Sequence, residues 1–273
     1  MMADFIYCLN SSTIKPTPIL EKIRIAGEAG YRGIELWHDD IDAHVAGGGT
    51  VQDVKKAVDD FGLDVPTTIF LKGWFDTTGA EHQTALDECR RRMEQASAVG
   101  AVHCVGGPPH DPVLDYELGA KNYGELLQIG IAEFGVRPSM EYLGFAQKLN
   151  TIEDALEIMV GSGHADATMI VDPFHCWVGG GPIESLQKLT AAQIGVSHFN
   201  DAPAAPDPST QRDPDRVMPG DGAIDLKLYC DCLRSIGYTR WLSLELFNTS
   251  LWARDPREVA VEGLEKMRSV AES

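Results

Sequence analysis

The chain is organised around the stretch Met169-Ile170-Val171-Asp172-Pro173-Phe174-His175, which joins a short apolar run to a carboxylate, a proline and an imidazole. A brief β-branched run that ends at a turn-forming residue is typical of a buried strand in a parallel sheet. Such a strand delivers Asp172 at its carboxyl end, and Pro173 predicts a sharp turn directly after it. His175 is then expected in that turn, close to the carboxylate.

The same arrangement recurs at three other apolar segments. The four segments deliver Glu141, Asp172, His198 and Glu245, separated by about one strand–helix unit each, with a longer loop before the last. A lone Asp before Pro is often only a turn former, but four polar groups in phase are harder to explain in that way. Three carboxylates and one imidazole at neighbouring strand ends suit a divalent cation of hard or borderline character. The sequence therefore predicts a metal site.

Apolar strands alternate with helical segments along the whole chain. Strands are expected over residues 4–10, 31–37, 63–70, 101–107, 135–143, 169–172, 194–201 and 241–247, and helical or connecting segments over 17–30, 51–61, 81–99, 115–134, from 150 onward, 182–189, 225–236 and 256–271. Eight such units predict a single α/β domain over residues 1–273, a closed (β/α)8 TIM barrel whose chemistry lies at the carboxyl ends of the strands. An open doubly wound sheet is the alternative, but its glycine-rich phosphate fingerprint is missing after the first strand.

The composition limits the partners and the location. The chain has 273 residues, 44% of them hydrophobic, and a formal net charge of −18 from 41 acidic and 23 basic residues. Such a surface repels polyanions, so neither nucleic acid nor an anionic membrane is an expected partner. The six cysteines show no C-x-x-C spacing and indicate a reducing compartment. Without a signal-peptide pattern or a long apolar run, a cytoplasmic protein is expected.

Six short motifs resemble the xylose-isomerase-like barrel superfamily, which includes the sugar phosphate isomerase/epimerase family. They are Gly30-Tyr-Arg-Gly-Ile-Glu35, Met140-Glu-Tyr-Leu143, Asp172-Pro-Phe-His175, Ser197-His-Phe-Asn-Asp201, Pro219-Gly-Asp-Gly-Ala-Ile-Asp225 and Ser243-Leu-Glu245. The resemblance covers nearly the whole chain. It implies a divalent cation, often Mn²⁺ or Mg²⁺, bound by Glu141, Asp172, His198 and Glu245. It also implies a small sugar or polyol that completes the metal shell and contacts His175, and an assembly into dimers or tetramers.

Two of the expected ligands are also candidate catalytic bases. A cation that binds the carbonyl and an adjacent hydroxyl of a 2-keto polyol acts as a Lewis acid and lowers the barrier to an enediolate. Glu141 and Glu245 could then remove and return the proton beside that carbonyl on opposite faces of the substrate. The result is an isomerisation or an epimerisation, depending on where the proton returns.

His175 and Arg216 are expected to bind the substrate. His175 either hydrogen-bonds a substrate hydroxyl or packs the loop. Arg216 lies in the Pro/Asp-rich loop over residues 202–223 and resembles the family's substrate-contacting arginine, with Arg212 as its competitor. Loops of this length in compact domains are usually functional or mobile. We therefore expect a partly mobile cover that brings Arg216 over the substrate.

Other side chains near the strand ends have two open interpretations each. Glu35 either binds a substrate hydroxyl or makes a structural hydrogen bond. Trp37, with Phe70 and Trp74, forms either an apolar wall for a sugar face or ordinary packing. Asp201 either orients His198 or caps the chain. The remaining candidates are His103 and His110, which flank the fourth strand.

The leading functional hypothesis is a metal-dependent isomerase or epimerase of a sugar, keto-sugar or polyol. The nearest alternative is a metal-dependent dehydratase of the 3-dehydroshikimate or inosose type, which expels a β-hydroxyl from the same enolate. An endonuclease-like phosphodiesterase for damaged DNA is a remote alternative, because the third strand ends in Thr67-Thr-Ile-Phe70 without a histidine and the chain is acidic. A sugar-binding barrel without catalysis is disfavoured by the full ligand set.

Overall fold

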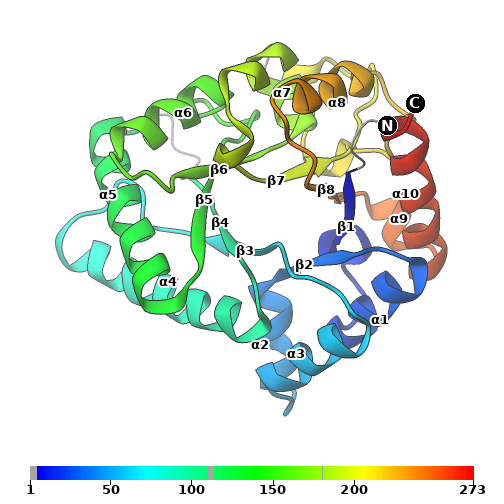
Figure 1. The fold of residues 1–273 in the computed structure, drawn as a ribbon, viewed down its shortest axis with the longest axis horizontal. Helices are drawn as coiled ribbons and strands as arrows, with labels where there is room; N and C mark the ends of the chain where they lie inside the picture. Colours follow the sequence, from blue (N-terminus) through cyan, green and yellow to red (C-terminus); the bar gives the residue numbers. More distant parts are fainter. Residues whose placement is uncertain (1–4, 110–112, 180) are drawn as a thin grey trace.

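The computed structural model describes residues 5–109, 113–179 and 181–273. Its parallel strands close into one barrel in the order of the sequence, with helices around the outside (Figure 1). The ring closes where β1 pairs with β8, from Ile6 opposite Trp241 to Leu9 opposite Leu244. The predicted (β/α)8 barrel is therefore confirmed. The strands are β1 Ile6–Asn10, β2 Gly33–Trp37, β3 Thr67–Leu71, β4 His103–Gly106, β5 Arg137–Glu141, β6 Thr168–Val171, β7 Ile194–Phe199 and β8 Trp241–Leu244.

The α-helices cover the barrel and return the chain from one strand to the next. They are α1 Ile19–Ala29, α2 His38–Ala46, α3 Val51–Asp60, α4 Gly79–Val99, α5 Tyr116–Ile129, α6 Ile152–Gly161, α7 Pro173–Gly179, α8 Leu226–Ser235, α9 Thr249–Trp252 and α10 Pro256–Ala271. Capping boxes start α3 at Thr50 with Asp53 and α6 at Thr151 with Asp154, which fixes these boundaries locally. Among the described residues, no helix is long and apolar enough to cross a membrane.

Three short helices were not expected from the sequence: α2, α7 and α9. The most informative is α7, because it replaces the sharp turn predicted at Pro173. Proline suits the first position of a helix, where its missing N–H is not needed. The carboxylate of Asp172 accepts a hydrogen bond from the Phe174 N–H at 2.7 Å and so satisfies one of the free donors of that first turn. His175 consequently lies in a helix rather than in a turn.

The interior of the barrel is built in layers, because alternate residues of each strand point inward. The middle layer is apolar and contains Ile69, Val105, Ile170 and Val196, all buried. Towards the amino ends of the strands lies a buried polar group in which His103 Nδ1 is 2.9 Å from Ser139 Oγ, which in turn is 2.8 Å from Thr168 Oγ1. Towards the carboxyl ends, two residues beyond Val196, lies His198. The apolar layer therefore separates the predicted site from the opposite mouth.

The apolar layer gives a test of the fold. Ile170→Ala is expected to lower the free energy of unfolding by about 2–5 kcal/mol, because Ile170 is fully buried and its truncation leaves a cavity in the barrel. Chemical denaturation measures this change. Val160→Ala is the matched control, since Val160 is 69% exposed and should change the stability by no more than about 0.5 kcal/mol. Equal effects of the two substitutions would contradict the assigned layer.

Candidate active site

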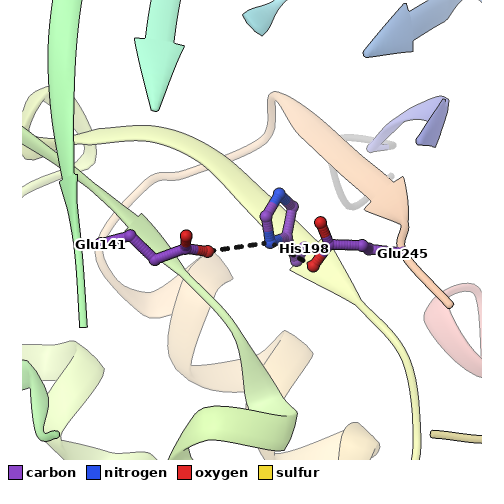
Figure 2. A group of neighbouring side chains, drawn as sticks. All are labelled: Glu141, His198 and Glu245. Carbon is purple, nitrogen blue, oxygen red and sulfur yellow. Dashed lines mark ion pairs between the residues drawn. The ribbon is translucent and has the colours of Figure 1, made fainter. Parts of the chain in front are cut away.

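The four predicted metal ligands lie together at the carboxyl ends of the strands. Glu141 ends β5, His198 lies on β7, and Asp172 and Glu245 directly follow β6 and β8. His198 Nδ1 is 3.0 Å from Glu245 Oε2, 3.4 Å from Glu141 Oε1 and 3.5 Å from Asp172 Oδ2. Figure 2 shows His198 between the carboxylates of Glu141 and Glu245. Residues that are far apart in the sequence thus meet at one imidazole.

Three of these residues fit a divalent cation on their geometry alone. One ligand atom from each of Glu141, His198 and Glu245 lies within 4.8 Å of the other two. Although carboxylates surround it, the buried Nδ1 of His198 has no hydrogen-bond partner among the described residues. Buried polar atoms of this kind call for an explanation, and a metal ion is one. Carboxylate oxygens with one imidazole nitrogen suit Mn²⁺, Mg²⁺ or Zn²⁺.

Asp172 is held by Arg216 and Asn200. Its Oδ2 accepts a hydrogen bond from Arg216 Nη1 at 2.8 Å, and Asn200 Nδ2 donates to both carboxylate oxygens at 3.1 and 3.3 Å. Burial would raise the pKa of Asp172, but the positive charge of Arg216 and the nearby imidazoles of His175 and His198 hold it well below its ordinary value. Asp172 is therefore a fixed anion at the base of the site.

The electrostatics place protons on the residues that a cation would use. Burial would lower the pKa of His198, but the carboxylates of Glu245 and Glu35 outweigh it and raise this pKa well above the ordinary value. Burial likewise raises the pKa of Glu141, against the opposing effect of His198. A cation that binds the imidazole of His198 must therefore displace a proton from it.

Glu35 lies deeper than a substrate-binding residue would. It is fully buried on β2 and accepts hydrogen bonds from Asn10 Nδ2 at 3.1 Å and from the hydroxyls of Thr67 and Ser243. Its Oε2 is 3.4 Å from His198 Nε2. These contacts are those of the second interpretation of Glu35, a structural hydrogen bond, and Glu35 does not line the cavity described below. Its carboxylate lies where it could orient the imidazole of His198.

Arg216 enters the site from the long loop and is only 1% exposed. Its Nη1 donates at 2.8 Å to both Asp172 Oδ2 and Glu245 Oε2, and its Nη2 lies 3.3 Å from His175 Nε2. The competitor Arg212 is exposed, with its guanidinium 5.9 Å from the ring centroid of Phe145. The structure thus places Arg216, and not Arg212, beside the predicted ligands.

The loop itself is anchored rather than free at its ends. Asp201 pairs with Val217 through two backbone hydrogen bonds. The carboxylate of Asp201 also accepts hydrogen bonds from the backbone N–H groups of Ala202, Gly220, Gly222 and Ile224. The interpretation of Asp201 as the orienter of His198 is therefore wrong. Asp201 organises the loop that delivers Arg216.

A cavity of about 160 Å³ lies above these residues. Its polar lining is formed by Glu141, His175, Asp213, Arg216 and Glu245, and its apolar lining includes Trp37, Ile69, Phe70, Pro108, Leu143, Phe145 and Phe247. The Trp37 ring is edge-on to Phe70 and Phe247, with centroids 6.2 and 5.8 Å apart. A ligand here would meet both charged groups and aromatic rings.

Two of the candidates near the mouth lie elsewhere. Trp74 is fully buried, with its ring 5.4 Å from that of Phe75 and 5.7 Å from that of Tyr123, and it does not line the cavity. His103 belongs to the polar layer at the opposite end of the barrel. His110 lies outside the described residues.

Sequence reasoning missed three residues that hold the site together: Asn10, Asn200 and Asp213. Asn10 Nδ2 donates to Glu245 Oε1 at 3.0 Å as well as to Glu35. Because Asn10 ends β1, the strand-end rule that found the other residues could have found it too. Asn200 directly follows β7 and is open to the same argument. Asp213 lies in an irregular loop, where no sequence signal indicates its contact with Arg216.

Comparisons with known proteins identify the family of this chain and relatives with the same fold. A family model described as xylose isomerase-like TIM barrel matches residues 23–270. An inosose isomerase of Bacillus licheniformis is 28% identical over 197 residues, 68% of this chain and 70% of that protein. The inosose isomerase of Bacillus subtilis is 31% identical over 171 residues, 61% of each chain. A 3-dehydroshikimate dehydratase of Pseudomonas aeruginosa is 26% identical over 253 residues, 90% of this chain but 39% of that protein.

Solved structures show the same fold at lower identity. The crystal structure of the IOLI protein with a bound zinc atom has a TM-score of 0.89 at 24% identity and covers 98% of both chains. The structure of L-ribulose 3-epimerase has a TM-score of 0.77 at 18% identity and covers 98% of this chain and 95% of that one. The curated relatives named above are enzymes, either isomerases or dehydratases. The matched segments span about two thirds of the isomerases and a smaller part of the dehydratase.

Binding of Mn²⁺ is expected to release protons and to weaken as the pH falls. His198 carries a proton when its pKa is raised, and a cation must displace it. Isothermal titration in buffers with different ionisation enthalpies gives the number of protons released between about pH 6 and 8. Binding without proton release across that range would contradict the assigned charge state of His198.

Glu35→Gln is expected to weaken Mn²⁺ binding by about 10–100-fold, because the imidazole of His198 loses the carboxylate that orients it. The dissociation constant can be measured from the free Mn²⁺ signal in electron paramagnetic resonance. Glu28→Gln, at an exposed position of α1, should leave the constant unchanged. An equal Mn²⁺ dissociation constant in wild type and Glu35→Gln would show that Glu35 does not orient His198 for metal binding.

Proposed function

We propose that this chain, which belongs to the xylose isomerase-like TIM barrel family, is a divalent-cation-dependent isomerase or epimerase of a small sugar, keto-sugar or polyol. The observation that carries the proposal is the pair Glu141 and Glu245, which approach His198 from β5 and from the end of β8 (Figure 2). Both carboxylates also line the cavity. Two carboxylates on different sides of one substrate carbon can exchange its proton between its faces. The inosose isomerases among the relatives support this reaction class.

The proposed cofactor is a divalent cation held by Glu141, His198 and Glu245, with Asp172 as the fourth expected ligand. A bound cation would polarise the substrate carbonyl and make the adjacent C–H bond more acidic. Mn²⁺ and Mg²⁺ are our first choices because three of the four groups are carboxylates. Zn²⁺ is a further candidate, since the IOLI structure contains zinc and the imidazole of His198 suits that ion.

The residues of the chain then have separate roles in the proton transfer. One of Glu141 and Glu245 takes the proton from the carbon next to the carbonyl, and the other returns it on the opposite face. Arg216 and His175 line the same cavity and donate hydrogen bonds to substrate oxygens. Burial lowers the pKa of His175, so this imidazole is neutral near pH 7 and keeps one N–H donor. The aromatic wall around Trp37 excludes water from the intermediate.

A dehydratase is the second candidate function. The 3-dehydroshikimate dehydratases of Pseudomonas aeruginosa and Pseudomonas putida match 90% of this chain, at 26% and 24% identity. Loss of water needs the same carbon deprotonation and also an acid that protonates the departing hydroxyl. His175 lines the polar side of the cavity and would have to bind a proton first to serve as that acid. The two functions are separated by their products.

The test is incubation with Mn²⁺ and a panel of keto-sugars, inososes and 3-dehydroshikimate in deuterated water. We expect deuterium to enter one carbon position of a keto substrate, together with an isomeric product seen by NMR. Loss of water from 3-dehydroshikimate, without isomers of the other compounds, would favour the dehydratase. No exchange in any compound would overturn the proposal.

Glu141→Gln and Glu245→Gln are each expected to lower kcat by about 100-fold or more, because an amide cannot accept the proton. Both variants keep the size of the side chain, so melting temperatures should show whether the fold is intact. Glu265→Gln, at an exposed position of α10, is the control and should keep wild-type turnover. Normal proton exchange in both active-site variants would make another residue, such as His175, the base.

A further inference from the structure

The guanidinium of Arg216 lies on the oxygens that a cation would need. Its Nη1 is 2.8 Å from both Asp172 Oδ2 and Glu245 Oε2. Asp172 and Glu245 are both expected metal ligands. A divalent cation bound to these oxygens would lie close to the guanidinium, and the two positive charges would repel each other at such short range. Arg216 and the cation therefore compete for one position.

The outer side of the same guanidinium is held by Asp213. Asp213 Oδ1 accepts hydrogen bonds from Arg216 Nε at 3.1 Å and from Nη2 at 2.8 Å. Asp213 begins the short 3-10 helix Asp213–Asp215, lines the cavity, and keeps 32% of its side chain exposed. The inner edge of the guanidinium, Nη1, thus contacts the buried carboxylates of Asp172 and Glu245. The outer edge, Nε and Nη2, contacts the part-exposed carboxylate of Asp213.

Aromatic rings and backbone hydrogen bonds surround Arg216 and fix its place at the cavity. Its centre is 4.7 Å from the ring centroid of Phe174 and 5.4 Å from that of Phe247, so it lies between two aromatic rings. The backbone is fixed, because Asn248 Nδ2 donates to the Arg216 carbonyl at 3.0 Å and Val217 pairs with Asp201. Any exchange of partners at this residue must therefore take place at the end of the side chain.

We propose that Asp213 is a positioning residue. It keeps Arg216 at the mouth of the cavity when a cation binds and the guanidinium releases the carboxylates of Asp172 and Glu245. In the metal-free protein Arg216 compensates the charge of Asp172 and Glu245. When a cation takes these oxygens, the contact with Asp213 holds the released guanidinium against the cavity, where it binds an oxygen of the substrate. The inference rests on the proposed metal-dependent function and adds a residue and an order of events to it.

The first experiment measures the Mn²⁺ dissociation constant of Arg216→Met. This variant keeps an unbranched side chain but removes the competing charge, so Mn²⁺ should bind about tenfold more tightly or better. Arg212→Met is the control: it removes the same charge from an exposed position of the same loop, and screening should limit its effect to about twofold. Arg216→Lys keeps the charge and should return the constant towards the wild-type value. Equal or weaker Mn²⁺ binding by Arg216→Met would overturn the competition.

Arg216→Met also gives a readout that is independent of metal affinity. Without a cation, the variant leaves Asp172 and Glu245 buried and uncompensated, so its melting temperature should fall below that of wild type. Mn²⁺ should then raise the melting temperature of the variant by more than it raises that of wild type. A residue with only a packing role would lose stability and metal affinity together.

The second experiment uses Asp213→Asn and Asp213→Glu. Asp213→Asn should raise KM by about tenfold, the scale of one charged hydrogen bond, while the Mn²⁺ dissociation constant stays within about threefold of wild type. Asp213→Glu keeps the carboxylate, so its KM should lie between those of wild type and Asp213→Asn. A wild-type KM in Asp213→Asn would overturn the positioning role. Failure of the proposed function looks different: substrates would not turn over, although Arg216→Met still bound Mn²⁺ more tightly.

Discussion

Mutual repulsion of buried carboxylates is the constraint on which the rest of this site depends. Glu35, Glu141, Asp172 and Glu245 lie within a few ångströms of one imidazole, and all but Glu141 are almost completely buried. Anions removed from water are costly unless cations and hydrogen-bond donors compensate them. His198 and Arg216 supply the positive charge, and Asn10, Asn200 and neighbouring hydroxyls supply donors. A site that needs this much compensation is suited to a divalent cation.

The barrel makes such a concentration of charge possible. Parallel strands bring their carboxyl ends to one mouth, and the apolar layer of Ile69, Val105, Ile170 and Val196 closes the interior below it. Above this layer lies the cavity, whose lining combines carboxylates with aromatic rings. Low local dielectric strengthens each ion pair there. The packing that stabilises the fold therefore also strengthens the ion pairs of the site.

The long loop over residues 202–223 serves as a support for Arg216. Asp201 draws four backbone N–H groups of this segment around its carboxylate. Glycine is required at two of the four positions. Gly220 has a φ of +84°, and a Cβ on Gly222 would lie 2.3 Å from Asp201 Oδ1. The loop expected as a cover is therefore braced by Asp201, and its partial mobility remains a prediction.

Local patterns in the sequence were sufficient to predict the barrel and to place four polar residues at the ends of its strands. Strand–helix alternation and the two-residue period of a strand are encoded over a few residues, so Glu141, Asp172, His198 and Glu245 could be placed at one mouth without a structure. The tertiary structure alone decided which side chains meet. Glu35 faces His198 across the barrel, Trp74 points into the outer core, and Arg216 enters the site where Arg212 does not. These contacts depend on strand register and on the path of an irregular loop. Both bring together residues that are far apart in the sequence, and no short repeating pattern encodes such contacts.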